Sequence, residues 1–342
     1  MMKILLATDA WYPQVNGVVR CLDHVRKDTR QFGADVHVLS HEGFTTIPLP
    51  TYSEIRLALT RPGAIARKIE AIGPEYVHIA TEGPIGHAVR RWCIKNGQPF
   101  TTSYHTRFPE YLRARVPVPV DLTYRYLANF HNAGRAVMVT TDALAEELRG
   151  RGFRTVVKWP RGVDNKLFRP REEKVLDFPG PISMYVGRVA VEKNIEGFLK
   201  LDIPGTKVVV GDGPQKAELE RKFPDVKFLG VKHGEELGAI YSSADVFVFP
   251  SRTDTLGFVV MEALASGVPV VAFPVTGPRD IVGDAPVGVL TEDLAAGVHE
   301  ALKLSREACR ARALEFSWDE CAKIFLDHLK AYQGDSVQRS AA

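Results

Sequence analysis

Short apolar runs rich in β-branched residues alternate with segments of helical pattern along the whole chain, and this alternation limits the fold more than any other feature. Near-continuous apolar strands separated by helices are typical of parallel sheets that are covered on both faces. The strands expected in the first half are Ile4–Thr8, Val36–Leu39, Tyr76–Ala80, Phe100–Tyr104, Val137–Thr140 and Val156–Lys158. The helices expected between them include Val18–Phe32, Ala64–Ile72, Ile85–Lys95 and Ala143–Arg151.

A second series of the same kind follows a break in the pattern. Between Arg161 and Gly180 the sequence turns to glycine, proline and charged residues, and a chain of 342 residues is long enough for two domains. We expect an α/β protein of two Rossmann-like domains, 1–165 and 166–315, facing each other across a cleft, with 316–342 packing back toward the first. The later strands expected are Ile182–Val186, Lys207–Val210, Val226–Leu229, Val246–Phe249, Val268–Ala272 and Val287–Leu290, before a last helix at Trp318–Tyr332.

The composition is that of a globular protein of the cytoplasm. Hydrophobic residues make up 45% and charged residues 25% of the chain. No apolar run approaches the roughly 20 residues that span a bilayer, and the first residues have the pattern of a strand instead of a secretion signal. The four cysteines are scattered without a C-x-x-C pair, which favours free thiols over disulfides or zinc.

Charge is divided unevenly between the two halves. Residues 1–170 hold 24 Lys and Arg against 15 Asp and Glu, a net +9, and the remaining 20 against 26 give −6. A basic half suggests that one domain meets an anionic partner, either phosphate groups or a membrane surface. Uneven solvated charge without a partner is the alternative.

Chemistry is expected just beyond the strands, because ligands of parallel α/β domains bind outside the carboxyl ends of the strands. Gly17 begins a helix after the first strand, where backbone N–H groups favour a phosphate, although a plain turn is the alternative. Arg188 and Lys193 follow the strand that ends at Val186, and a guanidinium with an ammonium suits a diphosphate. Two solvated surface cations are the alternative there.

The most informative segment is residues 249–271. A strand ends near Pro250, the following loop holds Asp254, and Leu256-Gly257 precede a strongly apolar helix with a single charge, Glu262. A carboxylate inside an apolar helix needs a partner, since leaving it unpaired would cost several kcal/mol. Both acids can face the same cleft, where hydroxyl-rich ligands need acceptors; pairing of Glu262 with a structural arginine is the alternative.

These motifs together resemble the large retaining glycosyltransferase family with the GT-B fold, and within it the phosphatidylinositol mannosyltransferase and sulfoquinovosyl diacylglycerol synthase branch. The main signature is P-S-x-x-(acid)-x-x-G-x-x-x-x-E-A, in which Asp254 stands where the family commonly has glutamate. The resemblance extends over nearly the whole chain. It includes the Gly17 loop, Tyr104-His105-Thr106, Gly162-Val163-Asp164, Gly187-Arg188 with Lys193, Gly211-Asp212-Gly213-Pro214 and Gly277-Pro278-Arg279.

The resemblance implies a role for each of these positions. Arg188 and Lys193 would hold the diphosphate of the nucleotide sugar, and Gly17 would let backbone approach its phosphates. Glu262 would bind the ribose hydroxyls, and Asp254 the hydroxyls of the transferred sugar. Leu256 and Gly257 would also belong to the donor site. His105 would lie at the sugar and help to stabilise developing charge; a hydrogen-bonded structural histidine is the alternative.

The acceptor is expected at the basic first domain. Aromatic and aliphatic residues are interleaved with arginine in a way that fits a surface dipping into lipid headgroups, although a helix packed on the domain core gives a similar pattern. The implied reaction moves a hexose or uronic acid from UDP-glucose, UDP-glucuronate or GDP-mannose to a membrane lipid such as diacylglycerol. The residues assigned to acceptor or membrane are Tyr104, Arg107, Tyr111, Arg113 and Arg115.

The absence of any D-x-D motif predicts a reaction without a metal or other cofactor. We expect the protein to associate peripherally with the inner face of an anionic membrane and to bind no nucleic acid. Three alternatives stay open: the same chemistry on a soluble or polysaccharide acceptor, a nucleotide-sugar 2-epimerase, and a non-catalytic nucleotide-sugar binder.

Overall fold

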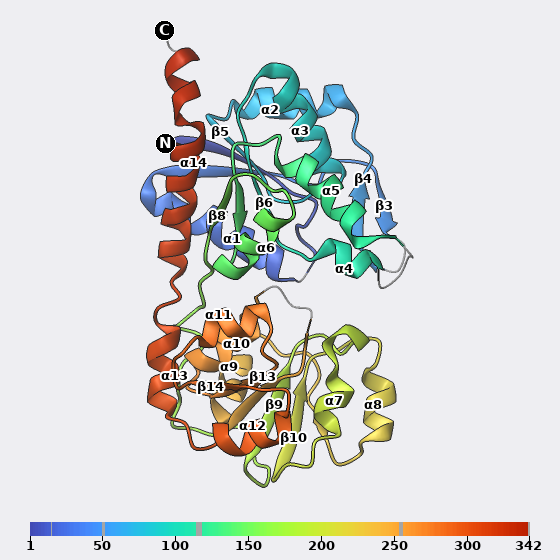
Figure 1. Ribbon diagram of the computed structural model, residues 1–342, viewed down its shortest axis with the longest axis vertical. Coiled ribbons are helices and arrows are strands. Elements are labelled where there is room, and N and C mark those ends of the chain that lie inside the picture. The colour runs from blue at the N-terminus through green and yellow to red at the C-terminus, as the bar shows by residue number, and fades with distance from the viewer. Residues whose placement is uncertain (15, 50–51, 114–117, 253–255, 341–342) are drawn as a thin grey trace. The chain divides into compact units, whose positions relative to one another are not determined.

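The chain consists of two compact units (Figure 1). The structure, a computed structural model, describes residues 1–14, 16–49, 52–113, 118–252 and 256–340. The first unit is Met1–Arg161 together with Trp318–Ala342, and the second is Gly162–Ser317. The chain therefore passes between the units twice, once after Arg161 and once after Ser317.

The first unit is built on a six-stranded sheet in which every neighbouring pair is parallel. Its strand order is β2-β1-β5-β6-β7-β8, and all six strands expected in the first half are confirmed in position. The antiparallel hairpin of β3 (Thr46–Leu49) and β4 (Tyr52–Ala58) was not expected. The sheet strands are β1 (Met2–Ala7), β2 (Ala34–Leu39), β5 (Tyr76–Ile79), β6 (Thr101–Ser103), β7 (Val137–Val139) and β8 (Val156–Lys158).

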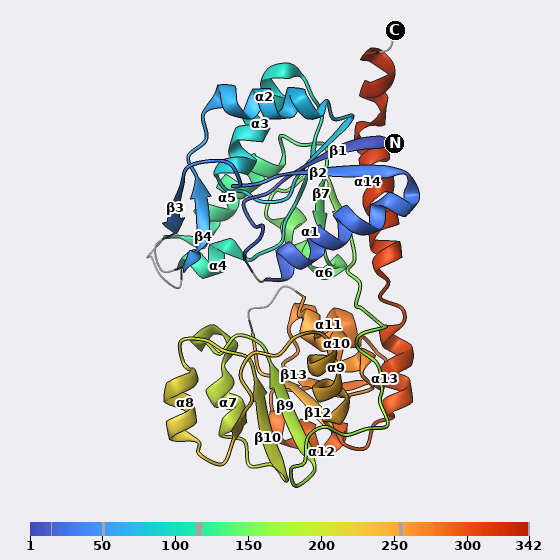
Figure 2. The same ribbon diagram turned by 180° about the vertical axis from the view of Figure 1, so that it is seen from behind.

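Helices cover both faces of this sheet, as the opposite views of Figures 1 and 2 show. The face with α2, α3 and α5 buries side chains such as Ile69, Val89 and Phe130 against Leu5 and Val77. The other face carries α1, against which α14 packs. The helices are α1 (Gly17–Asp28), η1 (Thr29–Phe32), α2 (Pro62–Ile72), α3 (Pro84–Asn96), α4 (Phe108–Arg113), α5 (Val120–His131), α6 (Asp142–Gly150) and α14 (Trp318–Ser340).

The second unit has a six-stranded parallel sheet of order β11-β10-β9-β12-β13-β14, the arrangement of a dinucleotide-type Rossmann fold. Burial on both faces explains its near-continuous apolar strands: Val246 and Val248 lie in one core cluster, and Phe247 and Phe249 in the other. All six strands expected here are confirmed. They are β9 (Ile182–Val186), β10 (Thr206–Val210), β11 (Lys227–Phe228), β12 (Val246–Phe249), β13 (Val270–Ala272) and β14 (Gly288–Leu290).

The helices of the second unit pack on both faces of its sheet. Arg310, in α13, joins several chain segments, since its guanidinium donates to the carbonyl oxygens of Asn165, Phe168 and Ala265. The helices are η2 (Val191–Lys193), α7 (Ile195–Leu199), α8 (Lys216–Lys222), α9 (Gly234–Ser243), α10 (Phe258–Ala265), α11 (Thr276–Val282), α12 (Leu294–Ala301) and α13 (Arg306–Ala313).

The last helix, α14, is part of the first unit and contacts α1, β5 and β6. Two buried polar contacts fix it there. The indole N–H of Trp159 donates to the Cys321 carbonyl oxygen at 3.0 Å. The side-chain amide of Gln333 accepts from the Val77 N–H at 3.0 Å and donates to the Val77 carbonyl at 3.1 Å, as a neighbouring strand would. The four cysteines are buried free thiols.

Candidate active site

The strand order of the second sheet reverses between β9 and β12, so the loops that follow these strands meet at a topological switch point. Arg188 and Lys193 follow β9, and Leu256, Gly257 and Glu262 follow β12. The fold therefore brings the residues expected to bind the diphosphate and the ribose to one edge of one sheet.

The loop after β9 is held in shape by glycines at positions where neighbouring atoms leave no room for a side chain. Gly187 has φ +148°, and a Cβ there would come within 2.7 Å of the Tyr185 hydroxyl. A Cβ on Gly211 would meet the Gly187 carbonyl oxygen at 2.0 Å, and one on Gly213 the Val189 oxygen at 2.3 Å. The Gly211–Pro214 segment thus supports the loop that presents Arg188, an exposed residue, and Lys193, a half-buried one.

One side chain ties this loop to the end of β12. Asn194 follows Lys193 with φ +52°, a conformation that asparagine tolerates better than most residues. Its side-chain N–H donates to the Pro250 carbonyl oxygen at 3.2 Å. Ser251 is fully buried, whereas the exposed Arg252 pairs with Glu292 at 2.5 Å. Asp254 lies outside the described residues.

The helix α10 begins after a residue in the left-handed conformation that glycine adopts readily. That residue is Gly257, which has φ +84°. The preceding residue, Leu256, packs against Gly277: a Cβ on Gly277 would lie 2.3 Å from the Leu256 carbonyl oxygen. Glu262 is 3% exposed, and its Oε2 accepts from the hydroxyl of Tyr241 in α9 at 2.9 Å. The expectation that this buried carboxylate has a partner is confirmed, and the partner found is a tyrosine. Tyr241 carried no sequence signal, since it is one apolar-face residue of an ordinary helix.

A carboxylate of the protein occupies the switch point of the first sheet, between β1 and β5. The Asp9 side chain accepts hydrogen bonds from the Ile85 N–H at 2.8 Å, the Gly86 N–H at 3.3 Å and the Thr81 hydroxyl at 2.8 Å. A Cβ on Gly83 would lie 2.4 Å from the Asp9 carboxyl carbon. Burial raises the pKa of Asp9, and the hydrogen bonds, which favour the charged form, lower it by less. The N-terminus of α3 is therefore already filled by an anion of the chain itself.

The N-terminus of α1 begins at Gly17, as expected, and Gly17 is exposed. Asn16 caps it, since its side-chain oxygen accepts from the N–H groups of Val18 and Val19, each at 3.0 Å. A phosphate approaching Gly17 would meet a helix end in which two N–H groups already have a partner.

His105 follows β6 and is half-buried. Its Nε2 lies 2.8 Å from the Ser103 hydroxyl oxygen, and its Nδ1 lies 3.4 Å from a guanidinium nitrogen of Arg161. Burial, and then the nearby Arg161, hold the pKa of His105 well below its ordinary value. Gly17 and His105 both lie beyond carboxyl ends of strands of the first sheet.

The acceptor or membrane assignments need correction at two positions. Tyr104 is fully buried in the core formed with α5 and α6, so it cannot face a membrane. The guanidinium of Arg107 makes a bidentate pair with Glu147, at 3.1 and 2.7 Å, so it is not a free surface cation. Arg113 is exposed at the end of α4, the side chain of Tyr111 is not described, and Arg115 lies outside the described residues.

The exposed face of α5 carries side chains that were not among the residues assigned to acceptor or membrane. Leu122 and Tyr126 are 55% and 53% exposed, and Arg125 between them is exposed as well. Tyr124, on the opposite side of the same helix, is 2% exposed and donates from its hydroxyl to Glu110 at 2.7 Å. Part of the alternation of aromatic residues and arginine in this segment is therefore explained by packing of α5 on the domain core, which was the alternative to a membrane surface.

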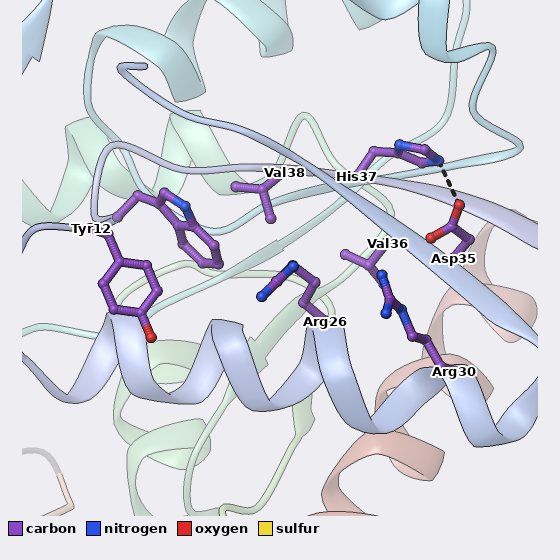
Figure 3. A pocket seen from close by; sticks show the side chains of 8 residues that line it. Tyr12, Arg26, Arg30, Asp35, Val36, His37 and Val38 are labelled. Carbon is purple, nitrogen blue, oxygen red and sulfur yellow. Dashed lines mark ion pairs between the residues drawn. The ribbon is translucent and has the colours of Figure 1, made fainter.

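A pocket of about 510 Å³ beside the edge strand β2 was overlooked. Figure 3 shows Arg26 and Arg30 rising from the helical segment below toward the strand that carries His37, which pairs with Asp35. Arg26 is already held by Asp23 at 2.9 Å. Asp35 lines the pocket together with these cations, so the lining is not purely cationic and does not indicate an anionic ligand.

Membrane-spanning helices and metal-binding clusters are both absent from the residues that the structure describes. None of the helices in that part of the chain is long and apolar enough to cross a membrane. No group of three or more His, Cys, Asp and Glu side chains within the same residues is arranged to hold a metal ion.

Two family models match the chain, one on each unit. The model described as Glycosyltransferase Family 4 matches residues 15–167, and the model described as Glycosyl transferases group 1 matches residues 180–306. The chain belongs to the glycosyltransferase family that these two models describe. This glycosyltransferase moves a sugar from a nucleotide sugar, and the family assigned from its motifs is confirmed.

Curated relatives resemble the glycosyltransferase along most of its length. The GDP-mannose-dependent alpha-mannosyltransferase of Mycobacterium tuberculosis is 28% identical over 376 residues, which cover 99% of each chain. Sulfoquinovosyl transferase SQD2 of Arabidopsis thaliana is 29% identical, over 81% of this chain and 60% of its own. The alpha-monoglucosyldiacylglycerol synthase of Streptococcus pneumoniae is 24% identical, over 88% of this chain and 78% of its own.

Solved structures show the same fold. Sucrose-phosphate synthase from Thermosynechococcus elongatus has a TM-score of 0.78 at 20% identity, covering 97% of this chain and 99% of its own. Anabaena Alr3699/HepE, solved in complex with UDP and glucose, has a TM-score of 0.72 at 16% identity, covering 97% and 100%. The GT-B fold of two Rossmann-like domains with parallel sheets is thereby confirmed.

Proposed function

We propose that the glycosyltransferase is a retaining, metal-independent hexosyltransferase that transfers its sugar to the hydroxyl of a membrane lipid. The observation that carries the proposal is the pair of cations, Arg188 and Lys193, on a glycine-supported loop at the switch point of the second sheet. A diphosphate bound at this loop would be the leaving group of the reaction.

The chemistry needs stabilisation of charge on the departing diphosphate. Preorganised cations supply it without a metal ion, and removing one such group typically costs 10²–10³ in turnover, to order of magnitude. In a same-face displacement the leaving phosphate oxygen takes the proton of the attacking hydroxyl, so no separate base is required and the anomeric configuration is retained. Glu262 would hold the ribose hydroxyls, with its carboxylate oriented by the hydrogen bond that its Oε2 accepts from Tyr241.

The relatives favour a lipid acceptor. Their names include phosphatidylinositol dimannoside mannosyltransferase and alpha-monoglucosyldiacylglycerol synthase. The relatives that match this chain over nearly their whole length include three GDP-mannose-dependent alpha-mannosyltransferases. We therefore place GDP-mannose first among the sugar donors to be tested, before UDP-glucose and UDP-glucuronate.

A surface on the first unit suits an anionic membrane. Exposed Phe108, Leu122 and Tyr126 lie on α4 and α5, and the Tyr126 hydroxyl shares a 2.6 Å hydrogen bond with His87 that joins α5 to α3. Figure 1 shows these three helices side by side. Exposed cations on the same helices are Arg91 and Lys95 on α3, Arg113 on α4 and Arg125 on α5. Apolar side chains flanked by cations bind the headgroup region of anionic bilayers.

The test is a screen of radiolabelled GDP-mannose, UDP-glucose and UDP-glucuronate against diacylglycerol, phosphatidylinositol and a soluble saccharide. The proposal expects label in a lipid product whose anomeric configuration, measured by NMR, equals that of the donor. An inverted product would exclude the retaining mechanism. Transfer to the saccharide alone would favour the soluble acceptor.

The remaining alternatives separate in the same assay. A 2-epimerase interconverts sugars without an acceptor, and a non-catalytic binder releases no nucleoside diphosphate at all. A transferase instead releases nucleoside diphosphate in proportion to the acceptor that is glycosylated.

A further inference from the structure

A continuous chain of hydrogen bonds connects His105 to the last helix of the protein. The His105 Nε2 contacts the Ser103 hydroxyl at 2.8 Å, and that hydroxyl contacts the Nε2 of His78 at 3.1 Å. The His78 Nδ1 contacts the Thr101 hydroxyl oxygen at 2.9 Å, which in turn accepts from the Gln333 amide at 3.1 Å. Ser103, His78 and Thr101 are all fully buried.

Arg161 fixes the direction of this chain. A guanidinium only donates, so the His105 Nδ1 that faces it at 3.4 Å must be the unprotonated acceptor. The proton of a neutral His105 ring is then on Nε2 and is donated to Ser103. The Ser103 hydroxyl can in turn donate to the Nε2 of His78, which places the His78 proton on Nδ1, facing Thr101.

Arg161 is an unusual neighbour for a histidine because it is 3% exposed and its charge has no carboxylate beside it in the described part of the chain. Its hydrogen bonds go to the carbonyl oxygens of Trp159, at 2.6 Å, and Pro160, at 3.1 Å, and to His105. The guanidinium also stacks on the Trp159 ring at 3.9 Å. Protonation of His105 would add a second positive charge next to this buried one.

The charged and titratable groups around His105 all favour the neutral ring. They are Arg161 after β8, His78 on β5 and His131 on α5. Burial, with Arg161 and His131, lowers the pKa of His78 to about 3. The Nε2 of His131 lies 3.0 Å from the Glu82 carboxylate, so this acid pairs with His131.

We propose that Arg161 and Ser103 are positioning residues that hold His105 in one orientation as the Nε2–H tautomer. The hydrogen bonds from Ser103 to His78, and from there to Thr101 and Gln333, hold the Ser103 hydroxyl in place. The proposal rests on the proposed function in one respect only, that His105 lies at the reacting sugar. It implies that His105 acts as a fixed neutral dipole and does not take up a proton during turnover.

The first test needs no activity. In the ¹⁵N-labelled protein, two-bond ¹H–¹⁵N correlations distinguish the two neutral tautomers from imidazolium, and His105→Gln and His78→Gln assign the signals. The expected result is Nε2–H for His105 and Nδ1–H for His78, both unchanged between pH 5 and 8. A His105 found as the Nδ1–H tautomer, or titrating at the ordinary value of histidine, would overturn the proposal even if the Arg161 and Ser103 variants do not fold.

The second test removes the positioning groups. Arg161→Gln keeps a donor but removes the charge, so the pKa of His105 should rise and turnover should fall as the pH is lowered, a limb that the wild type lacks. Ser103→Ala should lower kcat about tenfold with little change in the KM for the sugar donor, the effect of one lost hydrogen bond. Arg161→Lys, which retains the charge, should restore the flat pH profile.

Matched controls separate positioning from stability. Ser183, a fully buried serine of β9, has a hydroxyl that forms no hydrogen bond with the described residues, so Ser183→Ala should leave turnover and the histidine signals unchanged. Arg310→Gln should lower the melting temperature without an acidic limb. Unchanged His105 signals in Arg161→Gln would overturn the proposal, whereas full turnover in His105→Ala would remove the catalytic role of His105 and leave the NMR result standing.

Discussion

The side-chain amide of Asn194 donates a hydrogen bond to the carbonyl oxygen of Pro250 at 3.2 Å. This bond joins the two loops that meet at the switch point of the second sheet. Lys193 precedes the donor directly, and Ser251 follows the acceptor directly. The loop that carries Arg188 and Lys193 is therefore attached to the end of β12. The loop that leads to Gly257 begins at the same place.

Loss of either cation of this loop should affect turnover more than folding. Arg188→Ala or Lys193→Ala is expected to lower kcat by roughly 10²–10³, as for loss of a preorganised group that stabilises a leaving group. Steady-state kinetics and a melting curve measure the two effects. The exposed Arg221, on α8, gives a matched control as Arg221→Ala. Normal turnover in a folded double variant would mean that the diphosphate binds elsewhere.

Glu262 should act on binding of the nucleotide sugar instead. Glu262→Gln is expected to raise the KM for the sugar donor about tenfold or more with a smaller change in kcat, because hydrogen bonds to a charged group are worth about 1.5–3 kcal/mol. Tyr241→Phe, which removes the hydrogen bond to the Oε2 of Glu262, should shift the same parameter by less. Glu236→Gln at an exposed ion pair is the control. An unchanged KM would make Glu262 a structural residue.

Metal removal tests the mechanism as a whole. With cations stabilising the leaving group, activity is expected to survive excess EDTA, measured as release of nucleoside diphosphate in chelated buffer. If EDTA abolished activity and Mg²⁺ or Mn²⁺ restored it, the reaction would belong to a different mechanistic class.

Asp9 is expected to be important for stability. Asp9→Asn replaces one carboxylate oxygen with an NH₂ group, which cannot accept the hydrogen bond from Ile85 or those from Gly86 and Thr81, depending on which oxygen is replaced. Each buried donor left unpaired costs about 1–3 kcal/mol of stability. Gly83→Ala should have a similar effect, since its Cβ would lie 2.4 Å from the Asp9 carboxyl carbon. Denaturant unfolding measures both, with the exposed Asp142→Asn as the control. A change below about 0.5 kcal/mol would show that the site relaxes easily.

The sequence predicts the sheets far better than it predicts the contacts at their ends. Every strand of both sheets was expected, because burial on two faces leaves an unbroken apolar run such as Val246–Phe249. The β3–β4 hairpin was missed, because Pro48 within β3 weakens the strand signal. Arg161 and His105 are 56 positions apart, and no local pattern connects two residues that only the sheet brings together. Arg107 was misassigned since a surface cation and half of a partly buried ion pair look alike in a sequence.

The last prediction concerns the surface of the first unit that is proposed to meet a membrane, where Leu122, Arg125 and Tyr126 are exposed on α5 and Arg113 is exposed at the end of α4. Each cation near an anionic leaflet contributes about 1 kcal/mol, and this contribution decays within a Debye length of about 10 Å at 0.1 M salt. Co-sedimentation with vesicles should therefore increase with the anionic lipid fraction and decrease with salt. Arg113→Glu with Arg125→Glu should weaken both vesicle binding and lipid glycosylation, while hydrolysis of the sugar donor in solution stays near wild type.

Leu122→Ser with Tyr126→Ser should weaken vesicle binding in a way that salt does not change, because the apolar contribution is not screened. The matched control is Arg221→Glu with Lys303→Glu, two exposed cations of the second unit that change the net charge by the same amount. Equal loss of binding in that control would mean that net charge alone drives association. Normal binding and lipid glycosylation by the Arg113 and Arg125 variant would make this face ordinary solvated surface, and a soluble acceptor would then become the better hypothesis.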